Sequence, residues 1–540
     1  MFGSSGIHAA ETILLLLLLM VAVFALIARR LRISYPIVLV IAGLLISFVP
    51  HIPRIPLNSD LVFLIFLPPL LYAAAWVTSW REFRANLVSI TMLAVGLVAF
   101  TVWGVAEFAD RFITLLDWKA GFVLGAVVAT TDAIAATSIA RAIGLPRRIV
   151  DILEGESLVN DATGLLALEF GLRLVVQGDT LTVGEGITRL LYLIIVGVGV
   201  GLMIGVVVAW GERFVDDGPI EIVVSLMVPY VAYLTAEGFH ASGVLAVVAC
   251  GLYMSRKSAT FFSPETRIQV LGVWSALTFI LNGVVFVLIG LQLPYVMAGI
   301  EKISRWTLLE YGALFGLMLI TLRLLWIFPA TALAYQIRTR LLGSHEERPK
   351  TREVFVIGWT GMRGVIALAA AISLPETLAN GAPFGARNLI VFLTFSVILV
   401  TLVLQGLTLP PLIRMLGLSS APGSNAEECS ARRTMLEEAI AYLEAGRATD
   451  DESYAHIYED LEHRYRHRLA AVGVVDHDDE HGHTPASYQR LREIAQGAVR
   501  AERRAMIRLR DEGRLSDDAL RLMQRDLDLQ ESRYDSPRIE

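Results

Sequence analysis

Long apolar stretches separated by short polar junctions run through the first three quarters of the chain. A helix needs about 20 mostly apolar residues to cross a bilayer, and thirteen stretches meet or approach that length. We therefore expect an all-α membrane protein with about thirteen transmembrane helices. The expected spans are residues 10–28, 35–49, 60–78, 87–107, 120–142, 150–175, 189–210, 219–237, 241–254, 268–293, 306–335, 354–374 and 388–410.

The junctions between these spans differ in positive charge, which predicts how the chain is threaded. Counting from the N-terminus, the odd-numbered junctions carry 17 Lys and Arg and the even-numbered ones carry 8. Basic residues concentrate on the cytoplasmic side of membrane proteins, so we place the N-terminus outside and the C-terminus in the cytoplasm of a multi-pass plasma-membrane protein. Arg29 and Arg30 follow the first apolar run and no basic residue precedes it. A cleavable signal peptide has the opposite order, so this run is expected to be retained.

The character of the chain changes beyond the last span. We expect a transmembrane domain over residues 1–412, a linker over 413–425 and a cytoplasmic helical tail over 426–540 that regulates the domain. In the tail, apolar residues recur at helical spacing, and a polar loop with three histidines interrupts it at 476–483. A solvated loop is the favoured interpretation of these histidines and a metal site is the alternative.

Composition excludes several classes of function. The chain is 55% hydrophobic and only 18% charged, against about 25% charged residues in soluble domains. Its net charge of −6 argues against nucleic acid as a partner. Cys250 and Cys429 are the only cysteines, so no disulfide framework or paired-cysteine metal motif is present. No phosphate-binding glycine loop is found, and we expect no cofactor.

Polar groups inside spans are the informative residues, because a charge at the bilayer centre costs at least ~2.5–3.5 kcal/mol. Thr130, Thr131 and Asp132 interrupt the fifth span between apolar runs. Side-chain oxygens there would satisfy backbone groups freed by a helix that breaks in mid-membrane, and Asp132 suits the start of a new helix. A single unbroken helix, with Asp132 facing a neighbour, is the alternative.

A second polar group lies in the sixth span. Ser157 and Asp161 are four residues apart and share one helix face, and Glu156 and Asn160 share the neighbouring face. A carboxylate beside a hydroxyl and an amide is an oxygen site, which suits a hard alkali cation. Glu154 lies nearer the expected cytoplasmic end. A purely structural polar cluster is the alternative.

A third group, residues 360–364, interrupts the twelfth span. Arg363 lies between Gly361 and Gly364 and needs a buried anionic partner, for which Glu156 is the candidate. Arg323 in the eleventh span is expected either to reach the interface or to pair structurally. Polar interruptions seven spans apart favour two halves of opposite orientation, an inverted repeat whose broken helices mark a transporter site.

These motifs, taken together, resemble the sodium/proton exchangers of the monovalent cation/proton antiporter superfamily, in the bacterial NhaP-like branch. The resemblance covers residues 60 to 412, in the family's order. It is carried by the stretches Leu67-Pro68-Pro69-Leu70, Thr131-Asp132, Leu153-Glu154-Gly155-Glu156-Ser157, Asn160-Asp161, Gly361-Met362-Arg363-Gly364 and Gln405-Gly406-Leu407-Thr408.

The resemblance implies a fold with thirteen spans, crossed discontinuous helices, and a core that moves against a dimerisation domain in a homodimer. It implies that Asp161 binds the cation and the proton. Asp132, Ser157 and Thr131 would supply further oxygens, with Asp161, Asp132 and Ser157 as sodium ligands. Asn160 occupies the position that is a second Asp in the electrogenic branch. Glu156 and Arg363 would form the family's buried salt bridge.

One departure concerns the stretch after Leu70. Many relatives carry an acidic residue there that helps with the cation, whereas this chain has Tyr72-Ala73-Ala74-Ala75. The coordination shell therefore differs from the usual one at Ala73, and the ion preference does not follow from the resemblance.

The expected activity is secondary active exchange of sodium or lithium for protons, one for one and without net charge, for pH and cation homeostasis. Potassium/proton exchange is the alternative within the family. A cation channel, a membrane sensor and an intramembrane enzyme are the alternatives of other classes. The sequence has no filter-like repeated loop for a channel, and the sixth span has no histidine to serve as a base for Ser157.

Overall fold

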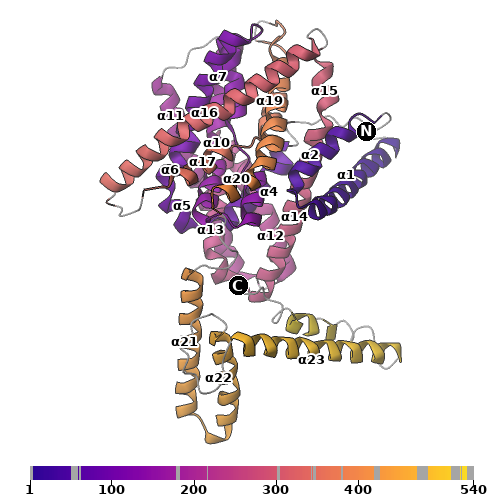
Figure 1. Ribbon diagram of the computed structural model, residues 1–540, viewed down its shortest axis with the longest axis vertical. Coiled ribbons are helices and arrows are strands. Elements are labelled where there is room, and N and C mark those ends of the chain that lie inside the picture. Colours follow the sequence, from indigo (N-terminus) through magenta and orange to yellow (C-terminus); the bar gives the residue numbers. More distant parts are fainter. Residues whose placement is uncertain are drawn as a thin grey trace. The chain divides into compact units, whose positions relative to one another are not determined.

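A computed structural model places residues 4–49, 59, 62–177, 183–215, 217–300, 304–341, 343, 348–378, 381–418, 426–470, 485–512, 523–524 and 526–531. Over these residues the chain is helical, without a β-sheet. It divides into two compact units, residues 1–419 and 420–540. Figure 1 shows the helices of both units.

The first unit is a bundle of helices, several of which are continued by π-helical segments. The α-helices are α1 (Ser4–Leu31), α2 (Tyr35–Ile46), α4 (Leu67–Val77), α5 (Trp80–Ala85), α6 (Leu87–Thr91), α7 (Val98–Phe112), α8 (Trp118–Ala129), α9 (Ala133–Ile143), α10 (Arg147–Leu172), α11 (Val183–Gly211), α12 (Gly218–Gly238), α13 (Gly243–Phe261), α14 (Pro264–Leu291), α15 (Leu293–Ala298), α16 (Arg305–Arg340), α17 (Thr351–Trp359), α18 (Val365–Ile372), α19 (Arg387–Val400) and α20 (Gly406–Met415). The π-helical segments are η1 (Val62–Phe66), η2 (Met92–Leu97), η3 (Arg173–Gln177) and η5 (Thr401–Gln405).

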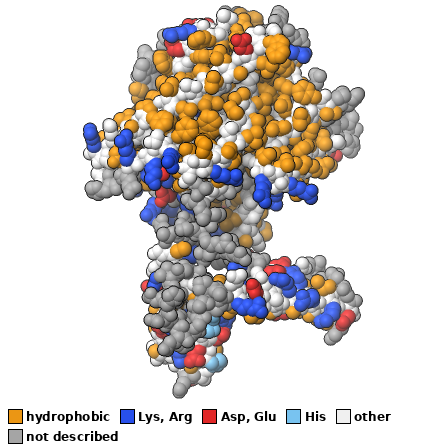
Figure 2. All heavy atoms as spheres, in the orientation of Figure 1, with side chains coloured by type: hydrophobic (Ala, Val, Ile, Leu, Met, Phe, Trp, Pro, Cys, Tyr) orange, Lys and Arg blue, Asp and Glu red, His pale blue; other side chains and the backbone are white. Residues whose placement is uncertain are grey.

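Eight helical stretches within the described residues are long and apolar enough to cross a membrane, and two more, Tyr35–Ile46 and Val62–Val77, are shorter apolar helices. The all-α membrane architecture is therefore confirmed, and the number of thirteen spans stays a prediction. Figure 2 shows apolar side chains over much of the visible face of this unit, with Lys and Arg gathered along one edge. Such a face suits lipid, where no polar partner is available to a side chain.

Two of the predicted spans are broken at the polar residues that interrupt their apolar sequence. The fifth span consists of α8 and α9, separated by Thr130–Asp132, and the twelfth consists of α17 and α18, separated by Thr360–Gly364. The backbone N–H of Asp132 donates to the carbonyl of Met362 at 2.9 Å. The two breaks therefore meet in space, although about 230 residues separate them in the sequence. The single-helix alternative for the fifth span is wrong.

Buried apolar residues form two main clusters in this unit. The first includes residues of α8, α10, α16, α17 and α19. The second includes residues of α4, α11, α12 and α13. In water, burial of each apolar side chain contributes roughly 1.5–3 kcal/mol to stability. Inside a membrane the lipid is as apolar as these side chains, so close packing between helices takes the place of the hydrophobic effect.

The second unit contains α21 (Ala426–Thr449), α22 (Ala455–Ala470) and α23 (Pro485–Asp511). α21 packs against α22, and α22 against α23. Leu436 and Leu443, two positions of the predicted helical repeat, are buried. The histidine-containing loop at 476–483 and the part of the expected linker at 419–425 lie outside the described residues.

Candidate functional site

The gap between α8 and α9 is held open by side chains of α10. The Ser157 hydroxyl donates to the Thr131 carbonyl at 2.7 Å, and Asn160 Nδ2 donates to Thr131 Oγ1 at 2.5 Å. The Thr131 hydroxyl in turn donates to Glu156 Oε1 at 3.3 Å. The predicted helix faces of α10 are therefore confirmed: Glu156 and Asn160 both reach the Thr131 side chain, and Ser157 reaches its backbone.

Asp132 begins the second half of the broken helix. Its Oδ1 accepts a hydrogen bond from the backbone N–H of Ile134 at 2.8 Å, which satisfies one of the free donors at the start of α9. Its side chain lies against Gly364 in the other break, where a Cβ atom would come within 2.5 Å of the Asp132 Cβ. Gly364 is therefore needed for the two breaks to approach this closely.

Asp161 differs from every other acid of this cluster. It is 2% exposed, and its Oδ1 has no hydrogen-bond partner within the described part of the chain. A buried carboxylate oxygen without a donor is unfavourable, unless a proton or a cation arrives to neutralise it. Among the carboxylates of this cluster, only Asp161 has a buried oxygen without a hydrogen-bond partner in the described part of the chain. It is also the residue that the resemblance assigns to the ions.

A cavity of about 490 Å³ brings these residues together. Asp161, Asp132, Thr131 and Ser157 line it with the apolar residues of η1 and α4, and Glu154 lines it further along α10. Asn160 and Glu156 are not among its lining residues, so the structure gives them contacts with the Thr131 segment and not with the cavity. Ala73 and Ala74 also line the cavity. The stretch in which the resemblance leads us to expect an acid therefore lies at the cavity wall.

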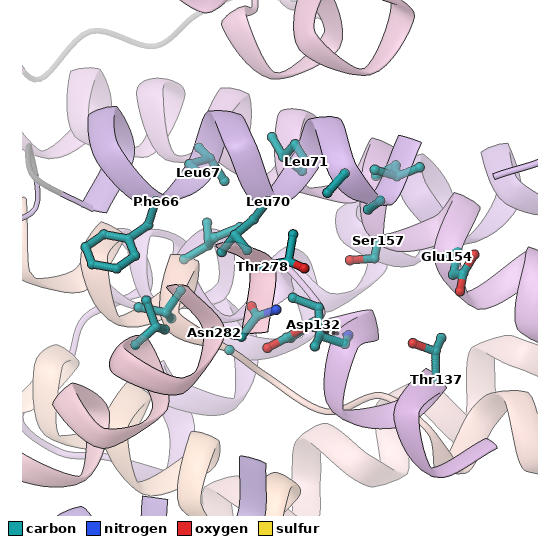
Figure 3. Close-up of a pocket in the computed structure, with 18 of the residues that line it drawn as sticks. Phe66, Leu67, Leu70, Leu71, Asp132, Thr137, Glu154, Ser157, Thr278 and Asn282 are labelled. Atoms are coloured by element: carbon teal, nitrogen blue, oxygen red, sulfur yellow. Dashed lines mark hydrogen bonds between the residues drawn. The ribbon is translucent and has the colours of Figure 1, made fainter. Parts of the chain in front are cut away.

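Sequence reasoning missed five hydroxyl and amide side chains of this cavity, namely Thr137 and Ser138 of α9 and Ser275, Thr278 and Asn282 of α14. Thr278 and Asn282 of α14 line it, and Figure 3 shows Asn282 beside Asp132. The signal was weak, because single Thr and Asn residues in an apolar helix are ordinary. The Thr278 and Asn282 side chains offer two more oxygens to the cavity.

The expected pairing of Glu156 with Arg363 is wrong. Glu156 instead forms a two-pronged ion pair with Arg323 of α16, with Nη1–Oε1 at 2.5 Å and Nη2–Oε2 at 2.8 Å. Both side chains are almost fully buried, at 1% and 2% exposure. A Cβ on Gly361 would overlap the Arg323 side chain, so the absence of a side chain at Gly361 makes room for the Arg323 side chain.

Arg363 has a different role in the structure. Its Nε donates to the carbonyl of Val128 at 2.6 Å and its Nη1 to the carbonyl of Gly361 at 2.8 Å. Val128 lies in the last turn of α8, where carbonyls have no partner inside the helix and the helix dipole is negative. The Arg363 guanidinium therefore compensates a free carbonyl at the end of α8 and not a carboxylate. For this reason it does not need Glu156 as a partner.

Comparisons with known proteins identify similar chains. Residues 15–415 match the family model of the transmembrane sodium/hydrogen exchangers. The chain is 31% identical to an uncharacterized Na(+)/H(+) exchanger of Mycobacterium tuberculosis, over 98% of this chain and 97% of the relative. It is 32% identical to a sodium, potassium, lithium and rubidium/H(+) antiporter of Bacillus pumilus, over 78% of this chain and 63% of that protein.

The fold has a solved counterpart. The sodium proton antiporter MjNhaP1 of Methanocaldococcus jannaschii superposes with a TM-score of 0.56 and 21% identity, covering 77% of this chain and all of that one. The family model matches nearly the whole of this all-helical membrane unit. The unit also has two helix breaks that meet beside a buried aspartate. The chain belongs to the sodium/hydrogen exchanger family of membrane antiporters.

Proposed function

We propose that this protein exchanges sodium or lithium for protons across the plasma membrane, with Asp161 as the carboxylate for which the ions compete. The observation that carries the proposal is the Asp161 Oδ1 atom, buried without a hydrogen-bond partner among the described residues, on the wall of a cavity lined with oxygen groups. Asp132, Ser157 and Thr131 are the further ligands in this proposal, either directly or through water.

The mechanism is competition at one neutralisable group. A bare carboxylate is costly inside a membrane, so the site crosses between the two sides only when Asp161 holds a proton or a cation. Exchange follows if the empty, charged form does not cross. Such a cycle needs no covalent step and no nucleotide.

The same reasoning supports an electroneutral one-for-one cycle. Glu156 is compensated by Arg323. Asp132 is compensated by the start of α9, because it accepts the Ile134 N–H and faces the positive end of the helix dipole. Asn160 carries no charge. Of these four residues, Asp161 is then the one left to carry either ion.

The test compares purified protein in liposomes that hold a pH gradient. Wild type should dissipate the gradient on addition of sodium, and Asp161→Asn should not, because the substitution keeps the shape and removes the titrating group. Glu169→Gln is the matched control: it removes one carboxylate from the same helix, at a position paired with Arg173 outside the cavity, and should retain exchange. Sodium-driven dissipation by Asp161→Asn would overturn the assignment.

Potassium/proton exchange is the second candidate. The Bacillus pumilus relative, which is named for sodium, potassium, lithium and rubidium, favours it. The same liposomes challenged with sodium, lithium and potassium in turn distinguish the two. A response to potassium equal to that to sodium would establish the broader exchange.

The proposal extends to assembly and orientation. The N-terminus lies outside and the C-terminus in the cytoplasm, where the residues from 426 onward regulate exchange, and two copies form a homodimer. Crosslinking of protein in membranes, and labelling of single cysteines introduced at the two ends, test these points. The activity serves pH and cation homeostasis.

A further inference from the structure

One side of α14 brings a second set of polar groups to the cavity that holds Asp161. Ser275, Thr278 and Asn282 are the polar residues of α14 that line this cavity. They follow one another at spacings of three and four residues, so they share one side of the helix. A polar side of a membrane helix is costly where it meets lipid. On the wall of a cavity beside a buried carboxylate, the same groups are available to an ion.

The Thr278 hydroxyl is oriented so that its oxygen acts as an acceptor. It donates to the carbonyl of Trp274 at 2.7 Å, and the carbonyl of Ser275 lies at 3.2 Å. A hydroxyl has one proton and two lone pairs, so directing the proton to the helix backbone leaves the lone pairs for another partner. The Ser157 hydroxyl on α10 also directs its proton to the backbone, to the carbonyl of Thr131 at 2.7 Å. Two helices therefore present hydroxyl oxygens to one cavity in the orientation that suits a cation.

Asn282 adds a neutral amide one turn further along α14. Its side chain is 7% exposed, lines the cavity and lies beside Asp132 (Figure 3). Tyr35 is a hydrogen-bond partner of this side chain. An amide has two N–H donors and a carbonyl oxygen with two lone pairs, so one tyrosine hydroxyl does not use all of them. The Asn282 amide can therefore bind Tyr35 and still present a polar atom to the cavity.

Neutral oxygen groups affect a cation and a proton differently. A proton on Asp161 forms one covalent O–H bond and needs no further oxygen. An alkali cation that leaves its hydration shell needs several oxygens to replace the lost water. Thr278 and Asn282 carry no charge and hold no exchangeable proton near neutral pH, so they can contribute to the shell of a cation without becoming a second proton carrier. Their loss should weaken binding of the cation and leave the proton on Asp161 unaffected.

We propose that Thr278 and Asn282 are ligands of the transported alkali cation, so that α14 sets the affinity for the cation while Asp161 exchanges it for the proton. This inference rests on the proposed function, because it takes Asp161 as the carboxylate that binds the ions. The alternative is a structural role, in which Thr278 bonds only to its own helix and Asn282 only to Tyr35.

Binding is measured as the melting temperature of the full chain in a neutral detergent, titrated with sodium chloride while choline chloride keeps the ionic strength constant. Sodium should raise the melting temperature in a saturable way, because a ligand that binds the folded state stabilises it. Thr278→Val and Asn282→Leu should each raise the half-saturating sodium concentration at least about fivefold, since each removes an oxygen from a charged ligand. Thr278→Ser keeps the hydroxyl and should respond as wild type does.

The matched control is Thr321→Val. The Thr321 hydroxyl on α16 also donates to a carbonyl of its own helix, that of Leu317 at 2.8 Å, but this threonine is exposed and does not line the cavity. Thr321→Val should therefore keep the sodium response of wild type. An equal shift in the two valine variants would show a general effect of losing a hydroxyl and overturn the assignment.

Exchange in liposomes gives the second readout. In Thr278→Val and Asn282→Leu the KM for sodium should rise by the same factor as the half-saturating concentration, while the rate at saturating sodium stays within about twofold of wild type. A lower maximal rate with an unchanged KM and sodium midpoint would show a structural role, which overturns the inference and leaves the proposed function in place. No exchange by wild type would instead refute the proposed function. In that case a shifted sodium midpoint in the variants would still support the two ligands, and an unshifted one would overturn them.

Discussion

Removing Arg323 should destabilise the protein more than removing the ion-binding carboxylate does. Arg323 and Glu156 are 2% and 1% exposed and share two short hydrogen bonds. Loss of one member of a buried pair leaves the other charge uncompensated, which typically costs about 3–5 kcal/mol. Arg323→Met should therefore lower the free energy of unfolding by about that amount, while Asp161→Asn should leave it unchanged or raise it, because it removes an unpaired buried charge.

Denaturation in detergent, followed by circular dichroism, measures these differences. The control is the double variant Arg323→Met/Glu156→Gln, which removes both charges and should recover much of the loss, as buried pairs replaced together often do. Arg363 offers a comparison, since it donates to carbonyls: Glu156→Gln should not rescue Arg363→Met. Equal stability of Arg323→Met and wild type, or a double variant as unstable as the sum of the single ones, would refute the pairing.

Three further results are expected. Gly364→Ala should reduce exchange at least tenfold, because its Cβ would displace Asp132, whereas Gly272→Ala, with nothing within 4 Å of the added atom, should exchange as wild type does; equal rates would refute the close approach. Exchange should produce no sustained current on a solid-supported membrane, and a current that reverses with the sodium gradient would reveal a second carrier. A chain that ends at Ser419, the limit of the first compact unit, should still exchange with a shifted pH profile, and complete loss in a well-inserted protein would place part of the machinery beyond it.

What could be predicted from the sequence was local. The break at Thr131 and Asp132 followed from polar residues inside an apolar run, and the shared faces of α10 followed from a spacing of four residues. Both depend on neighbours along the chain, and both are present in the structure.

What could not be predicted was the choice between two distant arginines. Arg323 and Arg363 each stand alone in an apolar helix, so nothing in their local sequence ranks them as partners of Glu156. The outcome depends on the room at Gly361 and on the free carbonyl at the end of α8. These are properties of the packed structure and not of any one segment.

The number of spans illustrates a related limit. α10 and the halves α17 and α18 are not among the eight long apolar helices of the described chain, although they hold Asp161 and the second break. Charged residues lower the apolar character of a helix, and a break shortens it. Two of the segments that form the ion site therefore escape a test of length and composition, whereas the stretch Trp118–Ala140, which contains Thr131 and Asp132, passes it.

The hydrogen bonds of the two breaks also restrict which oxygens can receive a cation. A break in a helix frees carbonyl groups that could serve as ligands, yet here the carbonyls of Val128 and Gly361 accept from Arg363, and those of Thr131 and Met362 accept from Ser157 and Asp132. A cation that used the first two would displace charge-assisted hydrogen bonds, which are about twice as strong as neutral ones. Side-chain oxygens that face the cavity carry no such penalty. Selectivity among alkali ions should then depend on the carboxylates and hydroxyls of the cavity wall, and substitutions there should change ion preference while substitutions of Arg363 change stability.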